Sequence, residues 1–242
     1  MASPDETEIG SLARRGIEAL KCCCLDDPTG SNDGFLWREM SFNAALRMRL
    51  YQGDVPGKVT RHKAVVLVPH SPREFLDALL NDPRRLVWDA SISHLESVAV
   101  GESGRLWIQY GVTKGVFGVS ARDFVSAVGF EDLDGGGIVH GGSGIPAGHP
   151  SFPERPGIVR ALNLEGVGWH LVPVPPPADA SEEQRANPWT RISYVVQTEL
   201  RGWLPQFVIN SAMSSTYSAF FGGVLEDLRR LKDEESKRTI RA

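Results

Sequence analysis

Between Arg201 and Glu226 the chain carries no charged residue. A helix of that length without charge has no ordinary solvated face, so either lipid or the rest of the protein must surround it. Gln206, Asn210 and several serines make the segment too polar for a membrane span, and neither an aromatic belt nor a basic flank follows it. We therefore expect a long helix that starts near Leu204 and is buried by the rest of the chain.

The composition is that of a globular protein. Of 242 residues, 41% are hydrophobic and 23% are charged, which suits one large domain or two small ones. The net charge of −4 argues against a nucleic-acid partner, because nucleic-acid binding needs clustered Lys and Arg. We expect a monomer that does not bind nucleic acid.

The N-terminal sequence and the cysteines bear on location. MASPDETEIG lacks the basic and apolar regions of a secretory signal, and it does not begin with Met-Gly as a myristoylation site does. Cys22, Cys23 and Cys24 are adjacent, which suits neither a disulfide framework nor a zinc site and favours a reducing compartment. They either close a helix as small apolar residues or form a palmitoylation site. We expect a cytoplasmic location.

The residue pattern predicts a helix, three strands, short helices, about six antiparallel strands and a final long helix. The first helix covers residues 6–24. Ser71, Pro72 and Glu74 form a capping box that starts the second helix, which ends near residues 82–83 and is followed by a short turn at 86–89. The strands are expected at 35–40, 46–51, 58–68, 92–100, 105–112, 122–133, 136–144, 157–166, 169–174 and 191–200. On the first helix one side carries Ile9, Leu12, Ile17 and Leu20.

Strands that are grouped in blocks predict the α+β class. A curved antiparallel sheet of this size has a concave face that must be covered, and only the helix near Leu204 is long enough to cover it. The segment 173–188 is Pro-rich and acidic, so we expect a mobile loop there. The chain divides into an N-terminal helix and linker (1–30), the main domain (31–235) and a charged tail (236–242).

Period-two alternation indicates which strand side chains face the covering helix. In residues 190–200 these are Ile192, Tyr194, Val196, Thr198 and Leu200, and in residues 122–130 they are Phe124, Ser126, Val128 and Phe130. One stripe of the long helix holds Ile209, Met213, Thr216, Phe220 and Val224, opposite the small residues Ser211, Ser215, Ser218 and Gly222. Such a helix is either a plain core element or the wall of an internal cavity.

Four short motifs occur in order along the chain: Trp88-Asp89, Ala121-Arg122-Asp123-Phe124-Val125, Gly157-Ile158-Val159-Arg160-Ala161, and Gly202-Trp203-Leu204-Pro205 followed by Ile209-Asn210. Over roughly residues 35–232 they resemble the START domain, the StAR-related lipid-transfer module. The resemblance implies a helix-grip fold, a lipid held in an internal tunnel, transient contact with a membrane surface, and no catalysis. In that fold the C-terminal helix is the lid of the tunnel.

The resemblance also implies roles for particular residues. Lys114–Val119 would be the loop at the tunnel mouth, where Val116 and Phe117 either touch a bilayer or pack inward as in an ordinary hairpin. Alternation in 105–112 sends Leu106, Ile108 and Tyr110 inward, whereas the resemblance sends Trp107 and Gln109 inward, and we follow the resemblance. The implied lipid-binding residues are Trp107, Gln109, Phe124, Ser126, Val128, Tyr194, Val196, Thr198, Ile209, Met213, Thr216 and Phe220.

One departure from the family bears on the ligand. Sterol carriers of the steroidogenic type place an acidic residue and an arginine opposite each other in the tunnel, and the corresponding positions here hold Gln109 and Val128. We therefore favour a phospholipid or another acyl lipid over a sterol. Arg122 and Asp123 are expected to form a charge pair that supports the fold. The alternative, which we favour less, is that Arg122 contacts a phosphate group of the ligand.

Three functions fit the sequence. The first is lipid binding and transfer between membranes, and the second is a lipid sensor that acts through a protein partner. The third is an enzyme like the polyketide cyclases, which would need an acid–base pair that the inward-facing residues do not supply. We expect no catalytic residue, no cofactor and no metal site, because His94, His140 and His170 do not have metal-ligand spacing and each suits a satisfied structural role.

Overall fold

The computed structural model describes residues 5–24, 35–54, 59–115, 120–202 and 206–241, with the side chains of 206–212, 235–236 and 239–241 left out. Its helices are α1 (Glu6–Cys23), α2 (Pro72–Leu80), α3 (Asp82–Trp88), α4 (Glu182–Arg185) and α5 (Gln206–Arg241), with a short 3-10 turn at Asp134–Gly136. Its strands are β1 (Leu36–Asn43), β2 (Met48–Asp54), β3 (Arg61–Val68), β4 (Ile92–Ala99), β5 (Leu106–Thr113), β6 (Arg122–Asp132), β7 (Ile138–Gly144), β8 (Val159–Arg160), β9 (Leu162–Asn163), β10 (Val167–Val174) and β11 (Trp189–Glu199).

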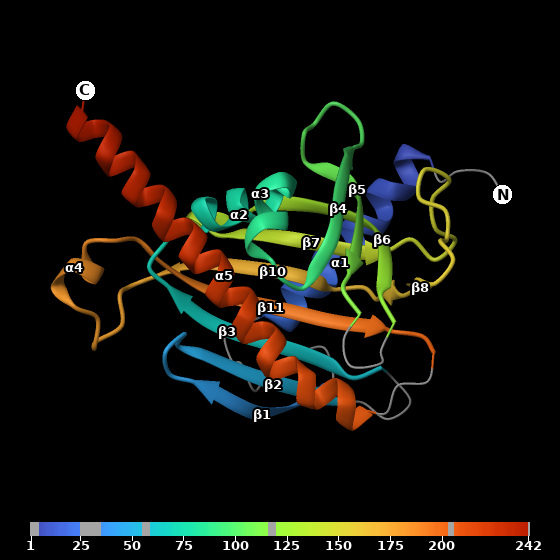
Figure 1. Ribbon diagram of the computed structural model, residues 1–242, viewed down its shortest axis with the longest axis horizontal. Coiled ribbons are helices and arrows are strands. Elements are labelled where there is room, and N and C mark those ends of the chain that lie inside the picture. Colours follow the sequence, from blue (N-terminus) through green and yellow to red (C-terminus); the bar gives the residue numbers. More distant parts are fainter. Residues whose placement is uncertain (1–4, 25–34, 55–58, 116–119, 203–205, 242) are drawn as a thin grey trace.

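The strands form one sheet in the order β1-β2-β3-β11-β10-β7-β6-β5-β4, with β8 paired to β6 and β9 paired to β11. The pairings are antiparallel except that of β8 with β6. Helix α5 runs across one side of this sheet, and α1 lies on the other side (Figure 1). The predicted α+β class and helix-grip arrangement are confirmed.

Helix α1 covers the face that we call the α1 face. Asp5 caps the helix by accepting a hydrogen bond from the Glu8 backbone N–H, and Ile9, Leu12, Ile17 and Leu20 are buried as predicted. The helix comes so close to β7 that a Cβ on Gly16 would lie 2.2 Å from the Gly142 backbone. Cys23 and Cys24 are buried at its end, as expected of residues that close a helix, while Cys22 is exposed.

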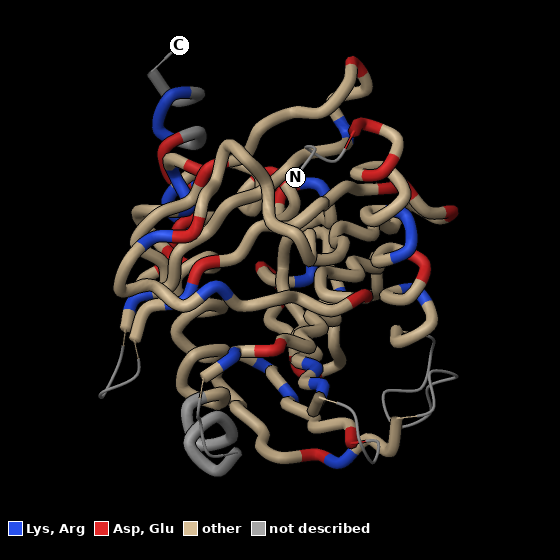
Figure 2. The backbone as a smooth tube through the Cα atoms, turned by 90° about the vertical axis from the view of Figure 1, so that its right-hand side faces the viewer, with Lys and Arg blue, Asp and Glu red and all other residues tan. Residues whose placement is uncertain are grey.

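The opposite face, which we call the α5 face, meets α2, α3 and α5. Phe75, Leu76 and Leu79 of α2 join Phe220, Phe221 and Val224 of α5 in the main core. Arg84 of α3 forms a partly buried ion pair with Asp227, which anchors the C-terminal half of α5. Beyond that point α5 extends past the sheet (Figure 1). Acidic and basic residues are interspersed along the backbone (Figure 2).

Three boundaries differ from the prediction. The Ser71–Glu74 capping box starts α2 as expected. Residues 82–88, however, form helix α3 rather than a short turn, because the Asn81 side chain caps a new helix by accepting from the Arg84 N–H.

The segment 173–188 contains the four-residue helix α4. Before this helix, Asp179 of the same segment accepts two hydrogen bonds from Arg47. Its mobility stays a prediction. Helix α5 continues through the charged tail to Arg241.

Candidate functional site

The two faces of the central strands differ in burial. On β5, β6 and β11 the side chains on the α1 face are buried, among them Ile108, Tyr110, Val125, Ala127 and Val195. Several of their neighbours on the α5 face are only half-buried, although a helix crosses that face: Trp107, Gln109, Phe124, Val128, Tyr194, Val196 and Thr198. Ser126, Phe130 and Ile192 on the same face are buried. Seven of the predicted lipid-binding residues therefore share one face and retain accessible surface there.

The conflict over β5 is settled by strand register. Trp107 lies opposite Val128, and Gln109 lies opposite Ser126. Trp107 stacks on Phe130, 5.9 Å between ring centroids, and so joins the core beneath α5. Ile108 and Tyr110 pack against α1. Alternation alone misled because both faces of this sheet are covered, so the more apolar set of residues does not mark the α5 face.

The α5 face carries polar groups among apolar side chains. The Gln109 amide donates a hydrogen bond to Ser97 Oγ at 3.3 Å. Asn163 bridges two predicted site residues, because its amide nitrogen donates to Ser126 Oγ at 3.3 Å and its oxygen accepts from Thr198 Oγ1 at 2.8 Å. This face can therefore hold a ligand that is mainly apolar but carries some polar atoms.

An aromatic cluster lies between the sheet and the middle of α5. Trp169 of β10 stacks on Tyr194 with 3.6 Å between ring centroids, and Phe220 packs against both rings. Tyr217 meets Tyr194 edge-on at 5.4 Å. Trp169 and Tyr217 were not predicted as site residues, although Tyr217 lies four residues after Met213, the spacing of one helix face.

The predicted stripe of α5 is partly wrong. Phe220 is buried, and Met213 packs against the core as expected, but Thr216 is exposed. The buried side chains are Tyr217, Phe220, Phe221, Val224 and Leu228, so the helix is rotated and Tyr217 takes the place expected for Thr216. The Ile209 side chain lies outside the described side chains, and Val116 and Phe117 lie outside the described residues.

Arg85 and Asp89 bring a charge pair into this core. Arg85 Nε donates to Asp89 Oδ2 at 3.4 Å, and Asp89, which is 1% exposed, also accepts from the backbone N–H and the hydroxyl of Ser91. The Arg85 guanidinium lies 5.9 Å from the ring of Trp88 and 5.7 Å from that of Phe220. Within the described residues this bond through Nε is the one hydrogen bond that the Arg85 side chain forms. The sequence prediction missed this arginine because it considered the Trp88-Asp89 motif alone, and Arg85 lies three residues before that motif.

Burial changes the pKa of three groups beneath α5. It lowers the pKa of His140 to about 4, so the imidazole is neutral at pH 7, and its Nδ1 donates to the Gly129 carbonyl at 2.9 Å. It raises the pKa of Tyr194 to about 12 and that of Tyr217 further above its ordinary value. His140 was expected to be a structural histidine, and its hydrogen bond to Gly129 agrees with that expectation. These groups give the interior no acid–base pair near neutral pH.

The described residues form an open surface pocket, which we call the cavity, of about 490 Å³ at the α2–α3 turn. It is lined by Asp77, Leu80, Asn81, Asp82, Pro83, Ser97 and Trp107. We expected the cavity between the sheet and α5, where the aromatic cluster lies instead. Trp107 connects the two regions, because it lines this cavity and packs against the core beneath α5.

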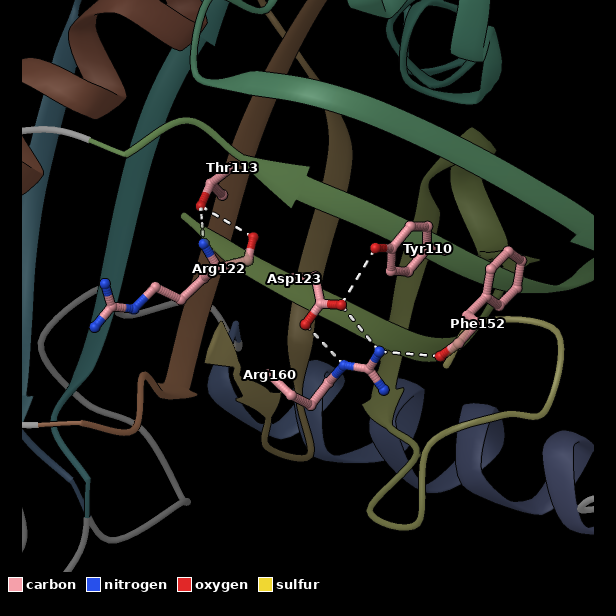
Figure 3. A network of polar contacts seen from close by, with 6 residues as sticks. All are labelled: Tyr110, Thr113, Arg122, Asp123, Phe152 and Arg160. Carbon is pink, nitrogen blue, oxygen red and sulfur yellow. Dashed lines mark hydrogen bonds and ion pairs between the residues drawn. The ribbon is translucent and has the colours of Figure 1, made fainter. Parts of the chain in front are cut away.

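The predicted Arg122–Asp123 charge pair is wrong. Adjacent residues of a strand point to opposite faces, and the two side chains leave β6 in different directions (Figure 3). Asp123 instead accepts two hydrogen bonds from Arg160, at 2.8 and 2.9 Å, and one from Tyr110 Oη at 3.2 Å. The Arg122 guanidinium donates to the backbone carbonyls of Ser120, Leu200 and Arg201, so it ties β6 to the turn that leads into α5.

Comparison with known families agrees with this geometry. The family model of the START domain matches residues 31–234. The chain belongs to the START domain family. Human StAR-related lipid transfer protein 4 is 26% identical over 174 residues, which cover 70% of this chain and 74% of that protein. The mitochondrial steroidogenic acute regulatory protein of Oncorhynchus mykiss is 26% identical over 218 residues, 89% of this chain and 69% of that protein.

Solved START domains have the same fold. Human StAR-related lipid transfer protein 5 superposes with a TM-score of 0.76 at 19% identity, covering 94% of this chain and 99% of that chain. A StAR-related lipid transfer protein from Xanthomonas axonopodis gives a TM-score of 0.61 at 19% identity, over 80% and 98% of the two chains. The described part of the START domain contains no helix long and apolar enough to cross a membrane. Membership in this family supports lipid binding and transport as the general activity.

Proposed function

We propose that this START domain binds one lipid against the α5 face of its sheet and transfers it between membranes. The half-buried strip on β5, β6 and β11 carries this proposal. Side chains such as Trp107, Val128 and Val196 keep accessible apolar surface on a face that a helix crosses, and bound acyl chains would cover that surface. Lipid binding needs no nucleophile or acid–base pair, and the neutral His140 beneath α5 suits a site without proton transfer.

Transfer by this protein requires direct contact with a membrane. Each CH₂ group brought into water costs about 0.8 kcal/mol, so a sixteen-carbon chain costs on the order of 12 kcal/mol. A lipid rarely leaves a bilayer against such a barrier, so the carrier must present its apolar face to the bilayer. The loop around Val116 and Phe117 and the turn before α5, which Arg122 holds, are the segments we assign to that contact.

We assign a phospholipid, or another acyl lipid with an anionic group, as the preferred ligand over a sterol. Gln109 and Val128 replace the charge pair of steroidogenic sterol carriers, and the Gln109 amide is bonded to Ser97. Arg85 lies beside the rings of Trp88 and Phe220, and within the described residues its two terminal guanidinium nitrogens form no hydrogen bond. A guanidinium is the kind of group that binds phosphate oxygens in pairs. Asp89 keeps its Ser91 hydrogen bonds if Arg85 turns toward a ligand.

The test combines lipid identification with one substitution. Lipids extracted from the purified protein should be phospholipids by mass spectrometry. Arg85→Met should lower phospholipid affinity about tenfold, as expected for one charge-assisted contact, while Arg15→Met on the exposed side of α1 should change nothing. A fluorescent sterol that binds tightly and is displaced only by sterols would reverse the preference.

Vesicle experiments separate transfer from sensing. A transfer protein should move a labelled phospholipid from donor to acceptor vesicles at a rate that rises with protein concentration. Binding without any transfer between vesicles would favour the sensor that acts through a protein partner.

A further inference from the structure

Tyr217 carries a buried hydroxyl group without a partner. The residue is 3% exposed, and within the described residues its Oη forms no hydrogen bond. Its neighbours are aromatic, with Tyr194 packed edge-on at 5.4 Å, and burial raises its pKa well above the ordinary value, so it keeps its proton. Proteins leave few buried polar groups unpaired, because each one destabilises the fold, so an unpaired hydroxyl in this place needs an explanation.

Trp88 presents a second unpaired group to the same cluster. It is 9% exposed, and its indole Nε1 has no hydrogen-bond partner within the described residues. The indole meets Phe220 edge-on at 5.1 Å, and Tyr217 lies one helical turn before Phe220 on α5. Arg85, one turn before Trp88 on α3, places its guanidinium 5.7 Å from the same Phe220 ring. Two donor side chains thus border the Phe220 ring, and the third, Tyr217, lies one helical turn away and packs on Tyr194, which stacks on the same ring.

The chemistry of these donors restricts what can satisfy them. An indole N–H and a guanidinium can only donate hydrogen bonds, and the hydroxyl of a protonated tyrosine can also donate. A ligand that satisfies all three must bring acceptors set close together inside an apolar molecule. A diacyl phospholipid has this pattern, because its two ester carbonyls lie a few bonds from the phosphate.

We infer that the Tyr217 hydroxyl and the Trp88 indole N–H donate hydrogen bonds to the ester carbonyl oxygens of a bound acyl lipid whose phosphate lies at Arg85. This inference rests on the proposed function. It makes Tyr217 and Trp88 selective for ester-linked lipids, because an ether-linked lipid of equal length leaves both donors unpaired.

The test uses Tyr217→Phe and two phosphatidylcholines with the same head group and chain length, one diacyl and one dialkyl. The wild-type protein should bind the diacyl lipid about tenfold more tightly. Tyr217→Phe should lose most of that preference through weaker diacyl binding alone. The lipid-free variant should melt at or above the wild-type temperature, because it no longer buries an unpaired hydroxyl.

Two further variants complete the test. Trp88→Phe should also reduce the diacyl preference, although it removes core volume and lowers the melting temperature. Tyr110→Phe is the matched control, since its hydroxyl is bonded to Asp123 on the α1 face and its loss should lower the melting temperature without changing the preference.

The outcomes distinguish this inference from the proposed function. If the wild-type protein binds both lipids with equal affinity, or if Tyr217→Phe weakens both alike, the inference is overturned while lipid binding stands. If the protein binds neither lipid, the proposed phospholipid function fails with it.

Discussion

Acidification should destabilise this protein through His140. Burial beneath α5 lowers the pKa of His140 to about 4, whereas an exposed histidine in the unfolded chain titrates near 6.5. Above pH 6.5 both states are neutral, and the residue adds no pH dependence. As the pH falls from 6.5 to 4, the unfolded chain binds a proton that the folded chain does not, so stability is lost. The difference of about 2.5 pKa units corresponds to about 3 kcal/mol.

The measurement is urea unfolding of the wild-type protein and of His140→Gln between pH 7 and pH 4. A glutamine amide can still donate to the Gly129 carbonyl that His140 Nδ1 bonds, but it does not titrate. The wild-type free energy of unfolding should therefore fall by about 3 kcal/mol more than that of the variant, at up to about 1.4 kcal/mol per pH unit. Carboxylates titrate in both proteins and cancel in the comparison. A constant difference between the two proteins over this range would refute the reasoning.

Two other predictions concern α5 and the mouth loop. Gly222→Ala should raise the free energy of unfolding by about 1 kcal/mol, because a Cβ there meets nothing within 4 Å and alanine favours helix. Gly223→Ala, at the next position, is the control. It should lower the free energy of unfolding by about 1–3 kcal/mol, since its Cβ would lie 2.5 Å from the Trp88 carbonyl oxygen. Equal shifts in the melting temperature of the two variants would contradict both expectations. Phe117→Asp should slow lipid transfer between vesicles with near-normal melting, because a loop tip that docks on a bilayer adds little to global stability. A sharp fall in melting temperature would instead place Phe117 in the core.

Much of the fold follows from local signals in the sequence. The Ser71–Glu74 capping box and the apolar spacing of Ile9, Leu12, Ile17 and Leu20 predict α2 and α1, because capping and periodicity act within a few residues. The uncharged stretch after Arg201 predicts the long covered helix. The start of α3 at Asp82, after the N-cap Asn81, was missed because a proline such as Pro83 is as typical of a helix end as of a helix start.

The site was harder to predict than the fold. Alternation identifies the two faces of a strand, but it identifies the ligand face only when the other face is solvated, and here α1 covers it. The rotation of α5 depends on packing with α2 and α3, which a run of Met, Thr, Ser and Tyr does not fix, so Thr216 was chosen in place of Tyr217. Arg85 becomes a candidate site residue only because it lies close to Phe220, which is more than a hundred positions away in the chain.

The alternation of the two faces has a consequence for how such a protein can diversify. Along β5 and β6 every second residue packs against α1 and maintains the fold, as Ile108, Tyr110 and Ala127 do. The residues between them, such as Trp107, Gln109 and Val128, face α5. Under the proposed function, mutations at the second set would alter the choice of cargo while the first set preserves the scaffold. Descendants of one ancestral chain would then acquire different lipids without first losing stability, and an engineer can randomise one set while holding the other constant.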